Sequence, residues 1–243
     1  MENTKTWFGE WFNTRYYHIL YKNRNNDEAK AFMQNLVSFL KLPKNNSILD
    51  LACGKGRHSI FLNTLGYPVI GADLSKNSID YANQFANNTL KFIVQDMRKP
   101  FNIKVDAVFN MFTSFGYFDE DSDDIKVLQN IEDCLNDEGV AVIDYMNVNK
   151  VIKNLVNAEV VTRDDIEFNI KRHVTDGFIT KEISLNENDE TLHFQERVKA
   201  IDLEKFKHYS KQANLKIKHI FGDYNLSDFD VENSDRLILI LTK

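Results

Sequence analysis

The chain has 243 residues, 43% of them hydrophobic, which suits one α/β domain with an insertion better than two equal domains. Its formal net charge of −6, without any block of Lys or Arg, argues against a general nucleic-acid binder, although this composition still allows a local basic groove. Cys53 and Cys134 have neither metal-ligand nor disulfide spacing, and no apolar run approaches the ~20 residues of a membrane helix. We therefore expect no metal, a reduced cytoplasmic setting and no membrane or nucleic-acid partner.

The first two predicted elements are helical. Residues 7–24 contain seven aromatic side chains before any sheet pattern begins, and they predict a helix that packs its aromatic face onto the domain. A second helix is predicted over 27–41, where apolar residues recur at helical spacing until Pro43 closes the segment.

The stretch over 48–65 predicts a strand, a tight turn and a helix. A short apolar run is followed at once by Gly54 and Gly56, and apolar residues then recur at helical spacing. Glycine permits backbone conformations that other residues avoid, and the helix N-terminus beyond it offers free N–H groups. A nucleotide-like ligand could therefore bind at this turn.

Neither of two phosphate-binding motifs fits the turn. The dinucleotide fingerprint G-x-G-x-x-G fails because Ser59 stands where its third glycine would fall. A phosphate loop needs lysine and then Ser or Thr after the second glycine, but Gly56 is followed by Arg57 and His58.

Three further apolar runs carry a polar side chain at or near their ends. They are 68–73 with Asp73, 90–97 with Asp96, and 105–112 with Asn110. Near-continuous apolar strands are typical of parallel sheets that are covered on both faces. An acid about 20 residues beyond a glycine turn also has the spacing of ribose recognition in βαβ units.

The second half of the chain changes from strand–helix units to short strands with alternating polar and apolar residues. A helix over 125–135, a break at 136–139 and a strand over 140–145 complete four strand–helix units, which predict a right-handed doubly wound parallel sheet. From about residue 147, polar and apolar residues alternate in short runs, which predicts a small antiparallel sheet with one solvent-exposed face. The expected closing elements are a helix over 203–214 and strands over 215–221 and 237–241.

The motif Asp50-x-Ala52-x-Gly54-x-Gly56 resembles the first motif of class I S-adenosylmethionine-dependent methyltransferases, with alanine at the usual first glycine. Asp73 resembles the second motif. The resemblance implies the family's α/β fold: a Rossmann-like, doubly wound, seven-stranded and mostly parallel sheet with a small inserted antiparallel sheet.

The same resemblance divides the chain. It implies a Rossmann-like domain in 1–146 and 201–243, with a helical lid and first helix in 1–42, and an antiparallel substrate cap in 147–200. The likeness is strong over 48–112, weaker in the cap and weakest at the N-terminus.

S-adenosylmethionine is the cofactor that the resemblance implies. In the family the glycine turn holds its methionine part, the acid at the place of Asp73 takes the ribose hydroxyls, and the acid at the place of Asp96 takes the adenine amino group. An acid beside the turn suits a ligand that carries a sulfonium and no phosphate. The expected cofactor contacts are Asp50, Ala52, Gly54, Gly56, Arg57, Asp73, Leu74, Asp96, Met97, Asn110, Tyr16 and Tyr21.

Substrate contacts are expected from the loop after the fourth strand and from the cap, namely Phe112, Thr113, Arg172 and Arg197. For the cap residues, charges on the solvent face of the sheet are the alternative. Methyl transfer from a sulfonium is an in-line displacement, to which positioning contributes more than a general base. If a base is needed, the candidates are Tyr17, His18, Tyr117 and His173.

We therefore expect an enzyme that methylates nitrogen or oxygen of a small polar molecule. A non-catalytic regulatory protein that binds S-adenosylmethionine is the alternative. An RNA or protein methyltransferase is less favoured, because the chain is acidic and lacks an Asn-Pro-Pro-Tyr motif. The sequence leaves open which acceptor is used and whether the protein is a monomer or a homodimer.

Overall fold

The computed structural model describes residues 7–22, 26–188 and 190–243. Parts of the predicted lid, at 1–6 and 23–25, therefore lie outside the described residues, as does residue 189 of the predicted cap. Within the described ranges, no helix is both long and apolar enough to cross a membrane.

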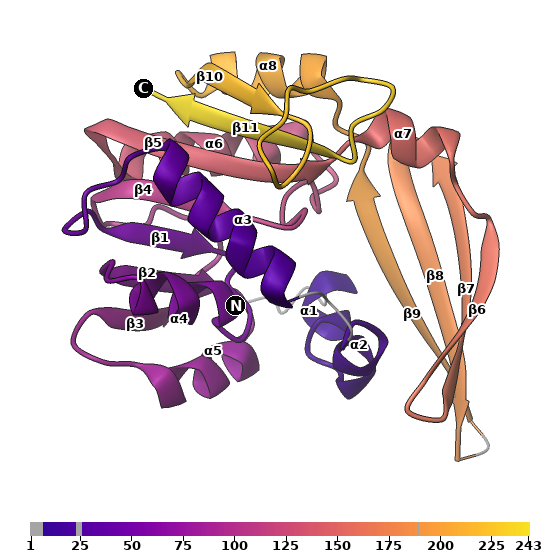
Figure 1. Cartoon of the computed structure of the whole chain (residues 1–243). Coiled ribbons are helices and arrows are strands. Elements are labelled where there is room, and N and C mark those ends of the chain that lie inside the picture. The colour runs from indigo at the N-terminus through magenta and orange to yellow at the C-terminus, as the bar shows by residue number, and fades with distance from the viewer. Residues whose placement is uncertain (1–6, 23–25, 189) are drawn as a thin grey trace.

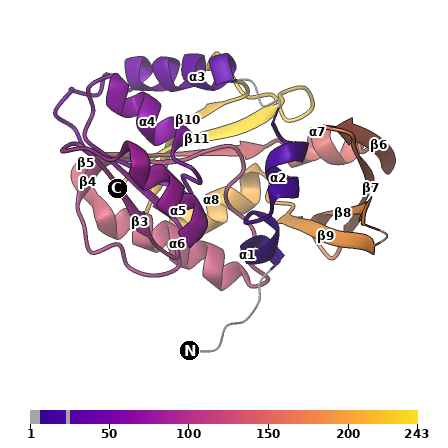
Figure 2. The same ribbon diagram turned by 90° about the horizontal axis from the view of Figure 1, so that it is seen from below.

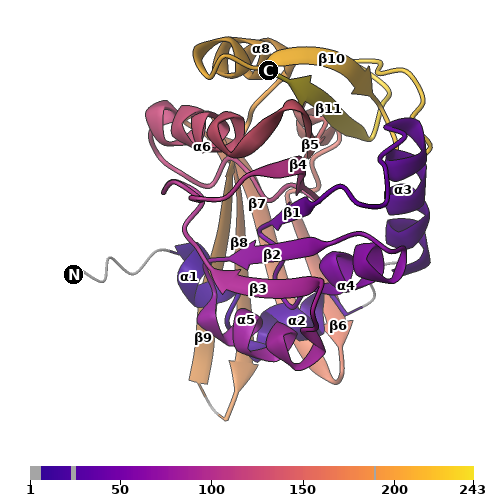
Figure 3. The same ribbon diagram turned by 90° about the vertical axis from the view of Figure 1, so that its left-hand side faces the viewer.

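A seven-stranded sheet forms the centre of the molecule (Figure 1). Its strands are β1 (Ile48–Leu51), β2 (Val69–Asp73), β3 (Leu90–Val94), β4 (Val105–Asn110), β5 (Leu135–Met146), β10 (Lys216–Phe221) and β11 (Arg236–Thr242). They lie in the order β3-β2-β1-β4-β5-β11-β10, and β11 alone runs antiparallel to both of its neighbours. Figure 3 shows β10 and β3 at opposite edges. The predicted fold class is confirmed.

Helices cover both faces of this sheet (Figure 2). One face carries α3 (Asn26–Phe39), α4 (Arg57–Thr64) and α5 (Lys76–Ala82), and the other carries α6 (Asp121–Cys134) and α8 (Leu203–Gln212); the short 3₁₀ helix η1 (Asn83–Phe85) follows α5 in the chain. Strand β11 shows why both faces are apolar: Ile238 packs with the first group of helices, and Leu239 packs with the second. Continuous apolar strands are what a sheet buried on both sides requires.

A second, antiparallel sheet stands beside the first (Figure 1). It consists of β6 (Ala158–Arg163), β7 (Ile166–Thr175), β8 (Phe178–Glu187) and β9 (Glu190–Lys199), and it follows α7 (Val148–Lys153). Its inner face packs Phe168 and Ile183 against α1 (Trp7–Trp11) and α2 (Arg15–Leu20), and its outer face exposes Glu167 and Lys171. We call this sheet the cap; its predicted bounds of 147–200 and its role in binding substrate stay predictions.

A buried ion pair joins the cap to the main domain. Lys199, at the end of β9, is 2% exposed, and its Nζ donates to Asp124 at 2.6 Å and to Asp121 at 2.8 Å, both on α6. Burial raises the pKa of Asp124 to about 6, although Lys199 opposes the rise. Losing one partner of such a pair leaves an uncompensated buried charge, so the contact holds the end of β9 against α6.

The observed elements differ from the predicted ones at several ends. The aromatic N-terminal segment forms two short helices, because Thr14 caps the second one by accepting the Tyr17 N–H. Strand β3 ends at Val94, before Asp96. No break separates α6 from β5, since the chain becomes extended at Leu135 directly after the helix.

Candidate active site

A cavity of about 560 Å³ lies at the carboxyl ends of β1, β2, β3 and β4. The loops after these strands line one side, and α1, α2 and β9 line the other. Figure 1 shows α1 and α2 between the two sheets. Open α/β sheets bind their ligands at this edge, which makes the cavity the candidate active site.

The turn after β1 holds three residues in the left-handed backbone region: Ala52, Gly54 and Gly56, with φ of 62°, 56° and 79°. A Cβ atom on Gly56 would lie 2.6 Å from the ring of Phe92. A Cβ atom on Gly54, which lines the cavity, would meet no described protein atom within 4 Å. Glycine is thus needed at 56 for packing, and at 54 it leaves open the space beside the turn.

Asp50 and Asp73 bring two carboxylates to this turn. Asp50 is 2% exposed, and burial raises its pKa to about 6 although the hydroxyl of Ser59, which donates to it, opposes the rise. Asp73 accepts the N–H of Gly54 at 2.8 Å and that of Ser75 at 2.7 Å. Burial also raises the pKa of Asp73, against these two hydrogen bonds. A cationic ligand at the turn would favour the ionised form of both acids.

Asp96 reaches the cavity just beyond the end of β3, where Arg98 orients it. Its Oδ2 accepts from Arg98 Nη2 at 2.8 Å, and its Oδ1 accepts from the backbone N–H of Arg98 at 2.9 Å. Burial raises the Asp96 pKa, but the contacts with Arg98 outweigh it and bring that pKa below its usual value. Asp96 is therefore ionised and held in place before any ligand binds.

The loop after β4 is held in a strained conformation by β5 and β11. Phe112 and Thr113 are consecutive non-glycine residues with φ of 57° and 63°. The buried carboxylate of Asp144 accepts the Phe112 N–H at 2.7 Å and Arg236 Nε at 2.7 Å, and Arg236 Nη2 donates to Thr113 Oγ1 at 3.0 Å. Strained residues persist where their surroundings enforce them. Because Phe112 and Thr113 line the cavity, Asp144 and Arg236 determine the shape of its wall.

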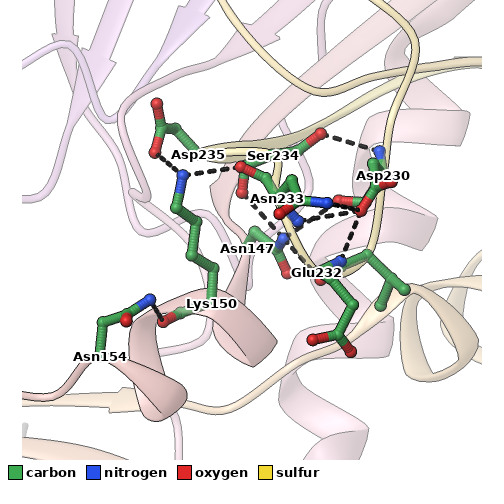
Figure 4. A network of polar contacts seen from close by, with 9 residues as sticks. Asn147, Lys150, Asn154, Asp230, Glu232, Asn233, Ser234 and Asp235 are labelled. Carbon is green, nitrogen blue, oxygen red and sulfur yellow. Dashed lines mark hydrogen bonds and ion pairs between the residues drawn. The ribbon is translucent and has the colours of Figure 1, made fainter.

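The segment before Arg236 is itself fixed to α7, as Figure 4 shows. The side-chain amide of Asn147 donates to the carbonyl oxygen of Ser234 at 2.9 Å. Lys150 Nζ donates to the carbonyl oxygen of Asn233 at 2.7 Å. These contacts fix the chain just before Arg236, the first residue of β11, whose side chain reaches Thr113 in the loop after β4.

The N-terminal helices supply an aromatic wall of the cavity. Trp7 and Tyr17 line it together with Tyr117 from the loop after β4, and the ring centroids of Trp7 and Tyr117 are 5.3 Å apart. Tyr16 lies outside the lining and donates its hydroxyl to Glu187 at the far end of β8. Only part of the aromatic segment therefore faces the cavity.

The three cap residues chosen from the sequence lie away from the cavity lining. Arg172 pairs with Glu159, and Arg197 pairs with Asp119. His173 is exposed on the outer face of the cap. The alternative of a charge on the solvent face describes His173, whereas Arg172 and Arg197 are only partly exposed and are paired with acids.

The cap instead contributes Glu196 and Val198 from β9. Glu196 accepts the indole N–H of Trp11 at 2.7 Å and the hydroxyl of Tyr21 at 2.7 Å. A signal for Glu196 was present in the sequence: it alternates with Phe194 and Val198, which makes it an acid on an apolar strand face.

Most of the predicted site residues meet at this one cavity. Those that line it are Asp50, Ala52, Gly54, Arg57, Asp73, Leu74, Asp96, Met97, Phe112, Thr113, Tyr17, His18, Tyr21 and Tyr117. Those outside the lining are Gly56, Asn110, Tyr16, Arg172, His173 and Arg197. Asn110 is buried below the loop, where its side-chain amide donates to the carbonyl oxygens of Leu51 at 3.1 Å and Ser114 at 3.2 Å.

Comparison with known proteins gives one family match and several relatives. The family model described as "Methyltransferase domain" matches residues 42–212. The Bacillus subtilis protein YqeM, named as a methyltransferase, is 31% identical over 128 residues, which are 51% of this chain and 52% of YqeM. The chain thus matches about half the length of this relative.

Two solved structures share the fold over nearly the whole chain. One is an S-adenosylmethionine-dependent methyltransferase from Clostridium acetobutylicum, with a TM-score of 0.77, 19% identity, and coverage of 93% of this chain and 95% of that one. The other is S-adenosylmethionine-bound CalS10, an amino pentose methyltransferase from Micromonospora echinaspora, with a TM-score of 0.67, 15% identity, and coverage of 94% and 97%. At these identities the likeness establishes the fold.

Proposed function

Because the chain belongs to this family of S-adenosylmethionine-dependent methyltransferases, we propose that it methylates nitrogen or oxygen of a small polar molecule. The observation that best supports a small acceptor is the form of the cavity, which runs from the glycine turn to an aromatic wall and the cap. Its volume of about 560 Å³ lies within the range of small-molecule sites.

The residues at the turn fit the cofactor. Gly54 leaves space for a ligand, and Asp50 and Asp73 offer acceptors to a ligand that bears positive charge and no phosphate. We assign the methionine part of the cofactor to the turn, the ribose hydroxyls to Asp73, and the adenine to Asp96 and the neighbouring Leu74. In that arrangement Asp73 keeps acceptor sites beyond the two that its backbone contacts use.

The chain's own contribution to the reaction is mainly alignment. When bound, the cofactor would supply a methyl group on a sulfonium, and attack by an acceptor lone pair on that methyl carbon would break the carbon–sulfur bond and release the neutral thioether, S-adenosylhomocysteine. The aromatic wall excludes water, and the loop at Phe112 and Thr113 positions the acceptor beside the turn. Tyr17, His18 and Tyr117 line the cavity and stay candidates for receiving a proton from the acceptor. We leave His173 out of the proposal, because it is exposed on the outer face of the cap.

Asp73→Asn is expected to weaken the binding of S-adenosylmethionine by about ten- to a hundredfold, because an amide cannot accept at both oxygen positions and carries no charge. Titration calorimetry measures the affinity. Asp106→Asn is the matched control. Asp106 is also a hydrogen-bonded acid, which accepts from Ser47, but it lies near the amino end of β4, whereas the cavity lies at the carboxyl end. Equal affinity for Asp73→Asn and the wild type, or no binding to the folded wild type, would contradict the assignment.

Gly54→Ala and Gly56→Ala are expected to separate ligand binding from folding. Alanine at 54 adds a methyl group to the open space beside the turn, so the cofactor should bind at least tenfold more weakly. Because residue 54 has a left-handed backbone conformation, which alanine disfavours, the unfolding free energy should also fall by about 1–2 kcal/mol. Alanine at 56 also meets the Phe92 ring, which should bring its destabilisation to about 2–4 kcal/mol. Urea unfolding and calorimetry test both variants, and unchanged cofactor affinity in Gly54→Ala contradicts contact at the turn.

Methyl transfer itself is tested with methyl-labelled cofactor and a library of small amines and alcohols. Label that appears in a library compound, together with demethylated cofactor, supports the proposal. Label that appears only in added RNA or protein refutes a small acceptor, and cofactor binding without transfer to any compound favours the regulatory alternative.

A further inference from the structure

Glu196 is a carboxylate on the cap wall of the cavity, facing the side opposite the cofactor acids. Its side chain is 16% exposed, and Phe194 and Val198 share its face of β9. A carboxylate in such surroundings is unfavourable unless hydrogen bonds or a counter-charge satisfy it. The hydrogen-bond donors and cations around Glu196 therefore indicate which ligand groups its carboxylate can still bind.

Neutral donors hold Glu196 in place. Trp11 Nε1 and the Tyr21 hydroxyl each donate to Glu196 Oε1 at 2.7 Å, and the Tyr21 hydroxyl also lies 2.8 Å from Oε2. Lys181 Nζ is farther from Oε2, at 3.7 Å, and donates instead to the Tyr21 hydroxyl at 2.6 Å. An ionised carboxylate has about four lone-pair sites, so these donors leave Glu196 with acceptor capacity.

Lys181 is the cation that faces Glu196, and its Nζ lies 3.7 Å from Glu196 Oε2 but only 2.6 Å from the Tyr21 hydroxyl. Burial lowers the pKa of Lys181, while Glu196 raises it and Arg172 on the adjacent strand lowers it. Arg172 in turn pairs with Glu159. Of these four charged residues, Glu196 is the one that lines the cavity, so its carboxylate is the group of the set that a ligand there can contact.

The part of the wall around Glu196 favours a cation, whereas Lys55 and Arg57 line the cavity at the glycine turn and Lys22 pairs with Asp164. Tyr17, Tyr21 and Tyr117 line the same cavity, and the ring centroids of Tyr17 and Tyr21 are 5.1 Å apart. Ring faces attract ammonium groups, and a nearby carboxylate adds to that attraction. An acidic acceptor finds no such help from the cap, because Arg172 and Arg197 are paired elsewhere and lie outside the lining.

From these contacts we infer that Glu196 is the subsite for an ammonium group of the methyl acceptor, so that the acceptor belongs to the small cationic amines. This inference rests on the proposed function. Glu196 binds the charged group by hydrogen bonds, and the Tyr17 ring beside Tyr21 offers it an aromatic face, while Lys181 already lies over the Tyr21 ring at 4.7 Å. A neutral polyol of the same shape gains only the weaker, uncharged hydrogen bonds.

Tryptophan fluorescence offers a direct readout, because Trp7 lines the cavity, Trp11 donates to Glu196, and the chain contains two tryptophans. The protein is saturated with S-adenosylhomocysteine and titrated with glucosamine, and separately with glucose as the neutral counterpart. The same titration compares ethanolamine with ethylene glycol. In the wild type we expect each amine to bind at least tenfold more tightly than its neutral counterpart.

Glu196→Gln is expected to abolish that preference and to leave the calorimetric affinity for S-adenosylmethionine within twofold of the wild type. Glu182→Gln, on the exposed outer face of the cap, is the matched control and should retain the preference. Lys181→Gln gives a second test that does not remove the carboxylate: loss of the opposing cation should tighten amine binding severalfold, whereas a purely structural role for Glu196 predicts no gain.

The outcomes separate this inference from the proposed function. If the wild type binds cofactor and methylates a library compound but shows no amine preference, or if Glu196→Gln keeps the preference, the Glu196 subsite is refuted and the function stands. If the wild type does not bind cofactor, the proposed function fails first. Equal amine affinity in Lys181→Gln and the wild type also counts against the subsite.

Discussion

Asp50→Asn is expected to stabilise the ligand-free protein while it weakens cofactor binding at least tenfold. Burial raises the pKa of Asp50 from 3.8 to about 6, and this difference corresponds to about 3 kcal/mol of unfavourable free energy once the carboxyl is ionised in the folded state. The amide replaces a charged acceptor for Ser59 by a neutral one, so the net gain at neutral pH should be about 2 kcal/mol.

The pH dependence gives the sign of this effect. Because the folded pKa is raised, Asp50 binds its proton more tightly in the folded state, so its favourable contribution is complete below pH 3.8 and is lost as the pH rises through about 6. The advantage of Asp50→Asn should therefore be small at about pH 4 and complete above about pH 7. Urea unfolding at both pH values measures it.

Asp106→Asn is the control with the opposite sign. Burial raises the pKa of Asp106, but hydrogen bonds from Ser47 and Asn136 outweigh this and lower it. The wild-type contribution of Asp106 is therefore present above pH 3.8 and lost as the pH falls through the lowered pKa, so the amide should destabilise at neutral pH. A lower stability of Asp50→Asn than of the wild type at neutral pH would show that the buried charge is compensated.

The residues proposed to bind the cofactor could be brought together from the sequence because their signals are local. Asp50, Gly54 and Gly56 occupy one strand–turn–helix segment, and Asp73 ends the next strand. Parallel strands in a doubly wound sheet place their carboxyl ends at one edge, so the strand order alone brings these residues together. The alternation of polar and apolar residues likewise predicted the antiparallel cap.

The acceptor half depends on contacts between distant segments. Tyr21 and Glu196 are 175 residues apart, and Arg236 and Asp144 are 92 residues apart. No local pattern selects such pairs, because the packing of the N-terminal helices and of β11 decides which side chains meet. Arg172 illustrates the converse: a cation in the cap suggested a substrate acid, but Glu159 on the adjacent strand pairs with it.

The left-handed backbone conformation of Phe112 and Thr113, in the cavity loop after β4, was equally unpredictable from the sequence. Phe112 ends an apolar run that predicts a strand over 105–112, and Thr113 follows directly after it. A hydrogen bond from the Phe112 N–H to Asp144 and one from Arg236 to Thr113 instead hold both residues at positive φ, and β4 ends at Asn110. Tertiary contacts thus override a local preference at the point where the cavity wall is formed.

Asp144→Ala is expected to destabilise the protein by about 3–5 kcal/mol, because it removes the partner of Arg236 and the acceptor of the Phe112 N–H. The Asp144 side chain is 0% exposed and that of Arg236 18% exposed, so neither group is well solvated in the fold. Asp235→Asn is the matched control. Asp235 lies 2.6 Å from Lys150, but its side chain is 77% exposed, and its loss should change stability by less than about 1 kcal/mol.

A double-mutant cycle separates the ion pair from general damage to the core. Arg236→Gln combined with Asp144→Asn removes both charges, so the double variant should be more stable than the sum of the two single losses by about 1–3 kcal/mol. Turnover should nevertheless stay low in the double variant, because Phe112 and Thr113 lose the contacts that hold their left-handed conformation beside the acceptor. Additive stability losses, or full turnover in the double variant, would show that Asp144 and Arg236 do not position the cavity loop.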